Sequence, residues 1–165
     1  MVNRGIGKAG GVDVLLKVAK LGDELDMGGG VGTEYNQITF DKETDEVVLI
    51  YAADILYDHL NGLGTGTEVN TAVSLDDDQI TVEMNDDATI FYWNLVKSFV
   101  TSGMQILAPH QLKSFSYPLI TSKPQVTVVS EVTTSTWANG ALNVYLFYTT
   151  RKLDAEARRV LIGTD

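Results

Sequence analysis

Residues 125–150 indicate the fold class most clearly, and they read QVTVVSEVTTSTWANGALNVYLFYTT. In the first part of this stretch, Val126, Val128 and Val132 alternate with polar residues. Side chains of an extended strand point to opposite faces in turn, so this alternation places the three valines on one face. The pattern predicts a strand over residues 125–134, with one face in a core.

The second part of the stretch alternates in the same way over residues 141–150. Leu142, Val144, Leu146 and Tyr148 share one side of this predicted strand. The dipeptide Asn139-Gly140 lies between the two runs and is a strong turn signal. Two strands of roughly ten residues span about 33 Å. We therefore expect a long antiparallel pair within a mainly β fold, an antiparallel β-sandwich or jelly roll.

Upstream of this stretch, further β-favouring runs flank polar turns. We expect two more hairpins, one from Gln37–Phe40 with Glu46–Tyr51 and one from Glu68–Leu75 with Gln79–Met84. The turns between them would be residues 41–45 and Asp76-Asp77-Asp78. Residues 104–108 are predicted to form a short strand that Pro109 ends.

One to three short helices are also expected. The segment 13–21 has a capping Asp13, and 88–102 places Phe91, Leu95 and Phe99 on one stripe. The tail 154–161 has an amphipathic pattern, and 52–60 also has helical spacing. Many residues of 88–102 are β-branched or aromatic, which favours a strand instead.

The length of 165 residues and a hydrophobic content of 44% suit one globular domain. Residues 1–11 contain four glycines and few apolar side chains, so we expect a flexible N-terminal arm there. Residues 12–165 are then a single β-sandwich domain with short terminal helices. The N-terminal segment contains no apolar run of the kind that a signal peptide needs.

The formal net charge of −10 is distributed in blocks. Residues 21–90 contain 17 acidic residues and one base, whereas the segments on either side each carry a net charge of +3. This layout favours a molecule that meets different surfaces on its two sides, with a solvated acidic surface as the alternative. The acidity argues against a specific nucleic-acid partner, because neutralising phosphates needs clustered Lys and Arg.

The sequence contains no catalytic signature. Absence of Cys excludes disulfide scaffolds, thiolate zinc sites and Cys nucleophiles, and two His cannot make a three-His metal site within one chain. Neither glycine-rich run, at residues 28–32 or 62–66, has the spacing of a nucleotide-binding loop. We therefore expect no enzyme activity, no metal, no cofactor and no small-molecule substrate.

Basic residues near the two ends are the candidate assembly residues: Arg4, Lys8, Lys17, Lys20, Arg158 and Arg159. The first four belong to a basic N-terminus, which we expect to dock onto a neighbouring subunit or onto an anionic inner layer or membrane surface. The alternative is an N-terminal helix that packs on its own domain.

The stretch from Val126 through Trp137 to Leu153 resembles the closing strands of a viral jelly-roll coat protein. The nearest family is the small single jelly-roll major capsid proteins of tailless icosahedral, internal-membrane-containing viruses of bacteria and archaea. The resemblance implies a structural subunit that self-assembles in a virion, with itself and related structural subunits as partners. A phage tail-tube or decoration protein is an alternative of the same class.

A carbohydrate-binding β-sandwich module is the alternative of another class. Trp137 and Tyr148 would then supply aromatic surfaces for a sugar, with a cation at the Asp76–Asp78 turn.

Overall fold

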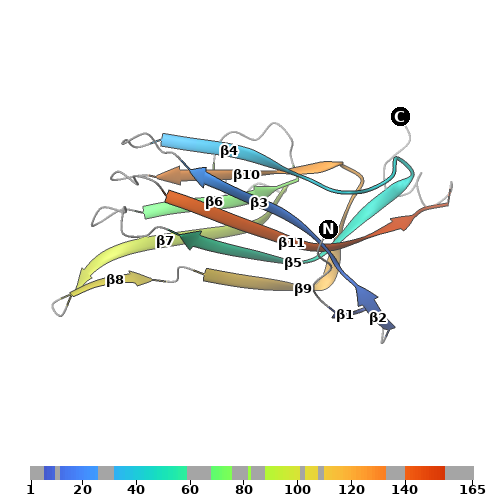
Figure 1. Cartoon of the computed structure of the whole chain (residues 1–165), viewed down its shortest axis with the longest axis horizontal. Helices are drawn as coiled ribbons and strands as arrows, with labels where there is room; N and C mark the ends of the chain where they lie inside the picture. The colour runs from blue at the N-terminus through green and yellow to red at the C-terminus, as the bar shows by residue number, and fades with distance from the viewer. Residues whose placement is uncertain are drawn as a thin grey trace.

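The computed structural model describes residues 6–9, 12–25, 32–58, 68–75, 82, 88–100, 103–107, 110–132 and 140–154. Every regular element in these ranges is a β-strand (Figure 1). The strands are β1 (Ile6–Ala9), β2 (Val12–Leu15), β3 (Lys17–Leu25), β4 (Gly32–Thr39), β5 (Glu46–Asp58), β6 (Glu68–Ser74), β7 (Thr89–Val100), β8 (Gly103–Leu107), β9 (His110–Thr121), β10 (Gln125–Val132) and β11 (Gly140–Lys152). The prediction of a mainly β, antiparallel fold is confirmed.

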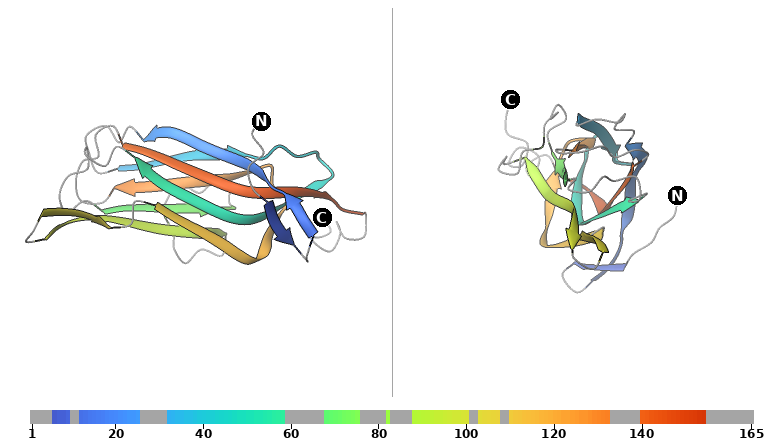
Figure 2. Two further views of the ribbon diagram at one scale, coloured as in Figure 1. Left: turned by 60° about the horizontal axis from the view of Figure 1, so that its bottom comes forward. Right: turned by 90° about the vertical axis from the view of Figure 1, so that its left-hand side faces the viewer.

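Nine of these strands form two large sheets in two layers, and β1 and β2 form a separate two-stranded sheet. A five-stranded sheet has the order β4-β10-β6-β7-β8, and a four-stranded sheet has the order β3-β11-β5-β9. Figures 1 and 2 show these two sheets stacked, with their strands along the long axis of the molecule. Strands β1 and β2 pair only with each other among the described strands.

The pairing of the strands is nested. The pair β6–β7 is innermost, and around it β5 pairs with β9, β4 with β10, and β3 with β11. In the two large sheets, each strand before the β6–β7 connection is thus matched to one after it. The pairs β10–β6 and β11–β5 then join this nested set into the two sheets.

The core lies between the two sheets and takes apolar side chains from both. Its fully buried large side chains are Ile38, Val48, Ile50, Ile55, Val69, Val73, Leu95, Val126, Leu142 and Leu146. Burial of such side chains is the main favourable contribution to folding, at about 1.5–3 kcal/mol each. The arrangement is sandwich-like, since each sheet contributes one apolar face.

The inward-facing residues predicted for 125–150 are confirmed, but β10 is also buried at Thr127 and Val129 on its other face. Val126, Val128 and Val132 lie in the core, as do the four inward residues predicted for β11. The predicted pairing of these two strands is wrong, because β10 belongs to the five-stranded sheet and β11 to the four-stranded sheet. A turn dipeptide reverses the chain, but it does not fix whether the next strand pairs in the same sheet or crosses to the other.

The predicted hairpin of Gln37–Phe40 with Glu46–Tyr51 fails for the same reason. Both strands exist, as β4 and β5, but they lie in different sheets. Of the other predicted hairpin, Glu68–Leu75 corresponds to β6, which pairs with β7 and β10. Its expected partner at 79–84 lies outside the described residues except for Val82.

Two of the expected helices are strands. Segment 13–21 forms parts of β2 and β3, and Ala19 faces the core while Lys20 is exposed. Segment 88–102 forms β7, with Phe91 and Leu95 buried and Trp93 packed beside them. The β-branched and aromatic residues of this segment fit a pleated, half-buried surface better than a helix.

The remaining ambiguous segment, 52–60, is the end of β5 as far as Asp58. The tail helix expected at 154–161 lies outside the described residues, apart from Asp154. Within the expected N-terminal arm, Ile6–Ala9 pairs with Val12–Leu15 in register. The arm therefore contributes one strand of a short antiparallel pair, which the sequence did not predict.

Candidate assembly surface

One flank of the molecule carries most of the large apolar side chains that are exposed among the described residues. Strand β9 is an edge strand that pairs only with β5 among the described strands. Leu112, Tyr117 and Ile120 on β9 are 56%, 84% and 46% exposed. With Leu56 on the neighbouring β5, they account for four of the five large hydrophobic residues that the described residues expose. We call these four residues the β9 flank.

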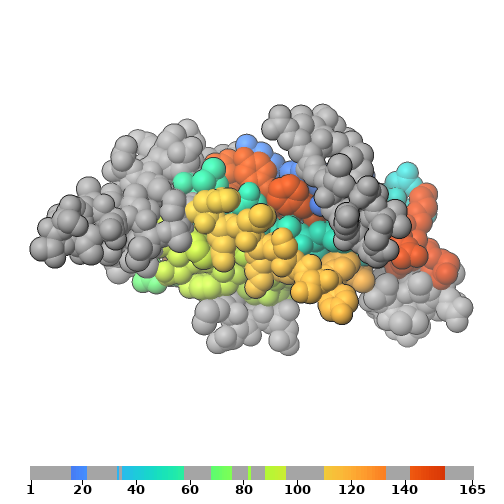
Figure 3. All heavy atoms as spheres, turned by 90° about the horizontal axis from the view of Figure 1, so that it is seen from below, coloured from blue at the N-terminus to red at the C-terminus, as the bar shows by residue number. Residues whose placement is uncertain are grey.

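The space-filling view shows β9 as an uncovered ridge across one face (Figure 3). Proteins commonly protect such edges with charged side chains or covering loops. From Ser114 to Ser122 the chain has no charged residue. The second half of this edge strand therefore has no charged side chain, and Lys113 is the one lysine of β9.

Tyr117 projects from a break in the pairing of β9 with β5. Ser114 pairs with Ala52, and the next paired residue, Leu119, is opposite Ile50. Four residues of β9, 115–118, therefore lie opposite a single residue of β5. In this bulge Phe115 packs against the core while Tyr117 points out to solvent. Pro118 suits such a position, because proline cannot donate to a ladder.

A carboxylate–imidazole contact lies beside the apolar residues of this flank. Nε2 of His110 on β9 lies 2.6 Å from Oδ1 of Asp54 on β5. In the register, His110 is opposite Leu56, and Asp54 is opposite Leu112. The contact ties the start of β9 to β5 on the same face as the two leucines. Sequence reasoning did not connect these two residues.

The charge of the sequence around β9 differs from that of the rest of the chain. No Asp or Glu occurs between Ala88 and Ser130, although the chain has 22 acidic residues. The same segment contains Lys97, Lys113 and Lys123. Strands β7, β8 and β9 thus form a basic part of an acidic molecule. This run free of acidic residues is the sequence signal that could have identified the flank.

Of the six predicted assembly residues, only Lys17 and Lys20 have side chains that the structure describes. Lys17 donates a 2.8 Å hydrogen bond to the carbonyl oxygen of Asp41, and its Nζ lies 3.7 Å from Asp41 Oδ2. It therefore links β3 to the chain that follows β4. Lys20 is exposed, with Nζ 5.3 Å from the centre of the Tyr145 ring. Arg4, Arg158 and Arg159 lie outside the described residues, and of Lys8 only the place in β1 is described.

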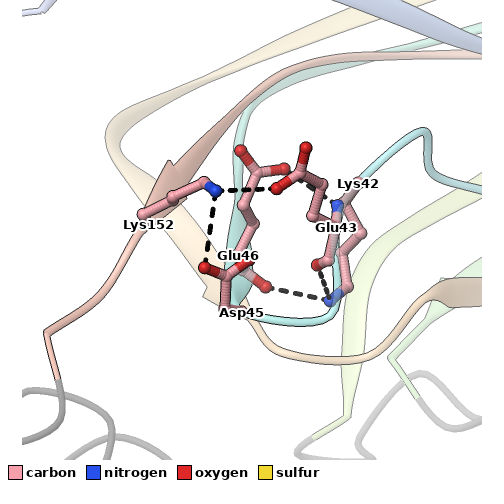
Figure 4. A network of polar contacts seen from close by, with 5 residues as sticks. All are labelled: Lys42, Glu43, Asp45, Glu46 and Lys152. Carbon is pink, nitrogen blue, oxygen red and sulfur yellow. Dashed lines mark hydrogen bonds and ion pairs between the residues drawn. The ribbon is translucent and has the colours of Figure 1, made fainter.

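A polar corner holds the β4–β5 turn to the end of β11 (Figure 4). Lys152 Nζ lies 2.7 Å from Glu43 Oε2 and 3.5 Å from Asp45 Oδ2. These two carboxylates raise the pKa of Lys152. Glu46 Oε2 accepts a 2.9 Å bond from the Glu43 amide, which lowers the pKa of Glu46. The corner fixes the turn between β4 and β5.

A second polar cluster lies on the face of the five-stranded sheet that points away from the core. Tyr92 Oη donates to Asn70 Oδ1 at 2.6 Å, and Asn94 Nδ2 donates to the same oxygen at 2.7 Å and to Glu68 Oε1. Partial burial, and then the charge of Glu68, raise the pKa of Tyr92. Glu131 lies opposite Asn70 in the register. Amides, carboxylates and a phenol are thus held together across three strands.

The aromatic residues predicted for a sugar site are not on this cluster. Tyr148 is buried in the core at 2% exposure, where its hydroxyl accepts a 2.9 Å bond from the Asp41 amide. Its assignment as a sugar platform is therefore wrong. Trp137 and the Asp76–Asp78 turn lie outside the described residues.

Within the described ranges, no group of three or more His, Asp or Glu side chains is placed to hold a metal ion. The same residues include no helix that is long and apolar enough to cross a membrane. No protein-family model matches the chain, and no curated protein sequence matches it either.

Proposed function

We propose that this chain is a structural protein that self-assembles, and that it serves as a coat subunit of a virion. The observation that carries the proposal is the exposed apolar β9 flank on an uncovered edge strand. Large exposed apolar patches on a soluble protein mark sites of protein–protein contact. A coat subunit works through such contacts with like or related subunits.

The finer fold assignment belongs to the same proposal. We assign the eight strands β3, β4, β5, β6, β7, β9, β10 and β11 to a jelly roll, with β8 as an extension of β7. Numbered one to eight, they follow the orders 1-8-3-6 and 2-7-4-5 in the two sheets. A long antiparallel ladder with nested pairs gives these orders when it rolls up, and this is the double Greek key of a jelly roll.

The fold alone does not specify the function, because jelly rolls also occur in lectins and enzymes. The distribution of side chains favours assembly. The large apolar side chains that the described residues leave in solvent gather mostly on the β9 flank, beside strands β7 to β9, whose sequence contains no acidic residue. These features suit lateral packing of upright subunits better than binding of a small molecule in a pocket.

Negative-stain electron microscopy of the purified protein tests the proposal. We expect regular particles, rings or sheets at concentrations where isolated 18.0 kDa monomers would be too small to recognise. The double variant Leu112→Asp/Ile120→Asp should not form them, while Arg151→Ala, at the exposed end of β11, should. Fields without regular particles for the wild type at every salt and protein concentration would contradict the proposal.

Carbohydrate binding is the second candidate function, and the cluster of Glu68, Asn70, Tyr92 and Asn94 favours it. Sugar hydroxyls both donate and accept hydrogen bonds, so carboxylate and amide groups held side by side can bind them, and an aromatic ring can pack on the sugar face. This site differs from the one predicted with Trp137 and Tyr148.

Glycan-array binding distinguishes the second candidate from the first. If it holds, Asn70→Ala should abolish binding, whereas Lys152→Ala at the polar corner should not change it. Trp137→Ala tests the earlier prediction in the same assay. Binding of no glycan by a protein that forms regular particles would leave the coat subunit as the function.

A further inference from the structure

The second polar cluster lies across three strands on the face of the five-stranded sheet that points away from the core. Asn70 of β6 is flanked by Asn94 of β7 and by Glu131 of β10, which are its partners in the two registers. In the next row along this face, Ala72 and Val129 are opposite each other, and both are fully buried. The cluster therefore lies at the margin of a covered stretch of this face.

The hydrogen bonds within the cluster fix how its two amides are turned. Asn70 Oδ1 accepts from both Tyr92 Oη and Asn94 Nδ2. Asn94 Nδ2 also donates to Glu68 Oε1. Among the described residues, Nδ2 of Asn70 and Oδ1 of Asn94 have no hydrogen-bond partner. A donor and an acceptor held in fixed orientations suit a sugar hydroxyl, because a hydroxyl group both accepts and donates.

The site also carries a carboxylate without a cation beside it. No hydrogen bond or ion pair with another described residue engages Glu131. Strand β10 and its two neighbours, β4 and β6, contain no Lys, Arg or His. Partial burial, and then the charges of Glu68 and Glu131, raise the pKa of Tyr92, so both carboxylates act on the same phenol. The charge of the cluster therefore favours a positively charged ligand and disfavours an acidic one.

We propose that this cluster binds an amino sugar, with the ammonium group on Glu131 and sugar hydroxyls on the amides of Asn70 and Asn94. The inference rests on the second candidate function, and it names the class of sugar that the site takes. A contact between an ammonium group and a carboxylate is a charge-assisted hydrogen bond, roughly twice as strong as a bond between neutral groups. An acidic sugar would instead bring a second negative charge to Glu131.

Isothermal titration calorimetry of the full chain with three tetrasaccharides tests the inference. At mildly acidic pH, tetramers of glucosamine, N-acetylglucosamine and galacturonic acid carry positive, no and negative charge, respectively. We expect the wild type to bind the glucosamine tetramer at least about tenfold more tightly than the N-acetylated tetramer. The galacturonic acid tetramer should give no binding signal.

Two matched variants separate this site from the overall negative charge of the protein. Glu131→Gln should reduce the affinity for the glucosamine tetramer to that for the N-acetylated tetramer. Glu43→Gln, which removes one negative charge at the polar corner, should leave both affinities unchanged. Circular dichroism and urea midpoints control for folding, and the comparison of tetramers on the wild type needs no variant.

The outcomes distinguish this inference from the candidate function on which it rests. Equal affinities of the wild type for the glucosamine and N-acetylglucosamine tetramers, equal losses in the two variants, or no binding of the glucosamine tetramer would overturn the amino-sugar inference alone. Binding of no glycan on the array would overturn the second candidate function as well.

Discussion

The hydroxyl of Tyr57 on β5 donates a 2.8 Å hydrogen bond to Oγ1 of Thr71 on β6, and so joins the two sheets through the core. Thr71 Oγ1 also lies 2.5 Å from Oγ of Ser130 on β10. All three side chains are almost fully buried. A second tie between the sheets lies at Tyr148, where the ring centre is 4.9 Å from that of Phe40. These polar and aromatic contacts fix how one sheet sits on the other.

The substitution Thr71→Val tests the first tie. It removes the hydroxyl that contacts both Tyr57 and Ser130 in the core, and we expect a loss of about 1–3 kcal/mol in the free energy of unfolding. Tyr57→Phe removes the hydroxyl itself and leaves Thr71 with Ser130, so it should cost less, about 0.5–1.5 kcal/mol. Urea denaturation of both variants gives the comparison. Equal losses, or a larger one for Tyr57→Phe, would refute this description of the tie.

Alkaline pH should weaken the fold through the buried tyrosines. Burial raises the pKa of Tyr57 far above the ordinary value of 10.0, and it also raises the pKa of Tyr148. A group whose folded-state pKa is raised stabilises the fold fully below its unfolded pKa, and this contribution is lost as the pH rises above it. The wild type should therefore lose more stability than Tyr57→Phe between about pH 9 and about pH 11. Urea titrations at several pH values measure both proteins. Equal losses of unfolding free energy for the wild type and Tyr57→Phe would show that Tyr57 does not contribute to the pH dependence.

Leu146 on β11 tests the contribution of the core. The residue is fully buried, and Leu146→Ala should lower the free energy of unfolding by roughly 2–5 kcal/mol. Leu112→Ala, at 56% exposure on β9, is the matched control and should change stability by less than about 0.5 kcal/mol. Similar urea midpoints for the two variants would contradict the assignment of their two faces.

Deletion of residues 1–11 should leave the fold intact and impair assembly. The deleted segment includes β1, which pairs only with β2 among the described strands, so the two large sheets keep all their partners. It also removes Arg4 and Lys8, two of the predicted assembly residues. The urea midpoint and the sedimentation profile of the truncated chain check the two parts separately. Full assembly by the truncated chain would show that residues 1–11 are not needed for assembly.

Several features of the fold could be predicted from the sequence because they depend on local periodicity. The alternation of Val126, Val128 and Val132, and of the inward residues of β11, correctly predicts both strands and their core-facing residues, but not the burial of Thr127 and Val129 on the other face of β10. The pairing of strands could not be predicted in this way. Which strand lies beside β10 depends on contacts with β4 and β6, which are about 50 to 100 residues away in the chain.

The candidate surface was harder to predict than the core, because its residues are recognised by exposure. Leu112 and Ile120 look like core residues in the sequence, and only the position of β9 at a sheet edge shows that they face solvent. The helix expected at 88–102 failed because Phe91 and Leu95 fit a helical stripe, although the full alternation also fits a strand. Tertiary context decides between such patterns.

The molar mass of the wild-type protein in solution tests the central claim most directly. Size-exclusion chromatography with light scattering, over a range of protein concentrations, should give masses that rise to multiples of 18.0 kDa. The rise in molar mass with concentration should be absent for Leu112→Asp/Ile120→Asp. A mass of 18.0 kDa for the wild type at every concentration would contradict the claim that this protein works by packing against its own kind.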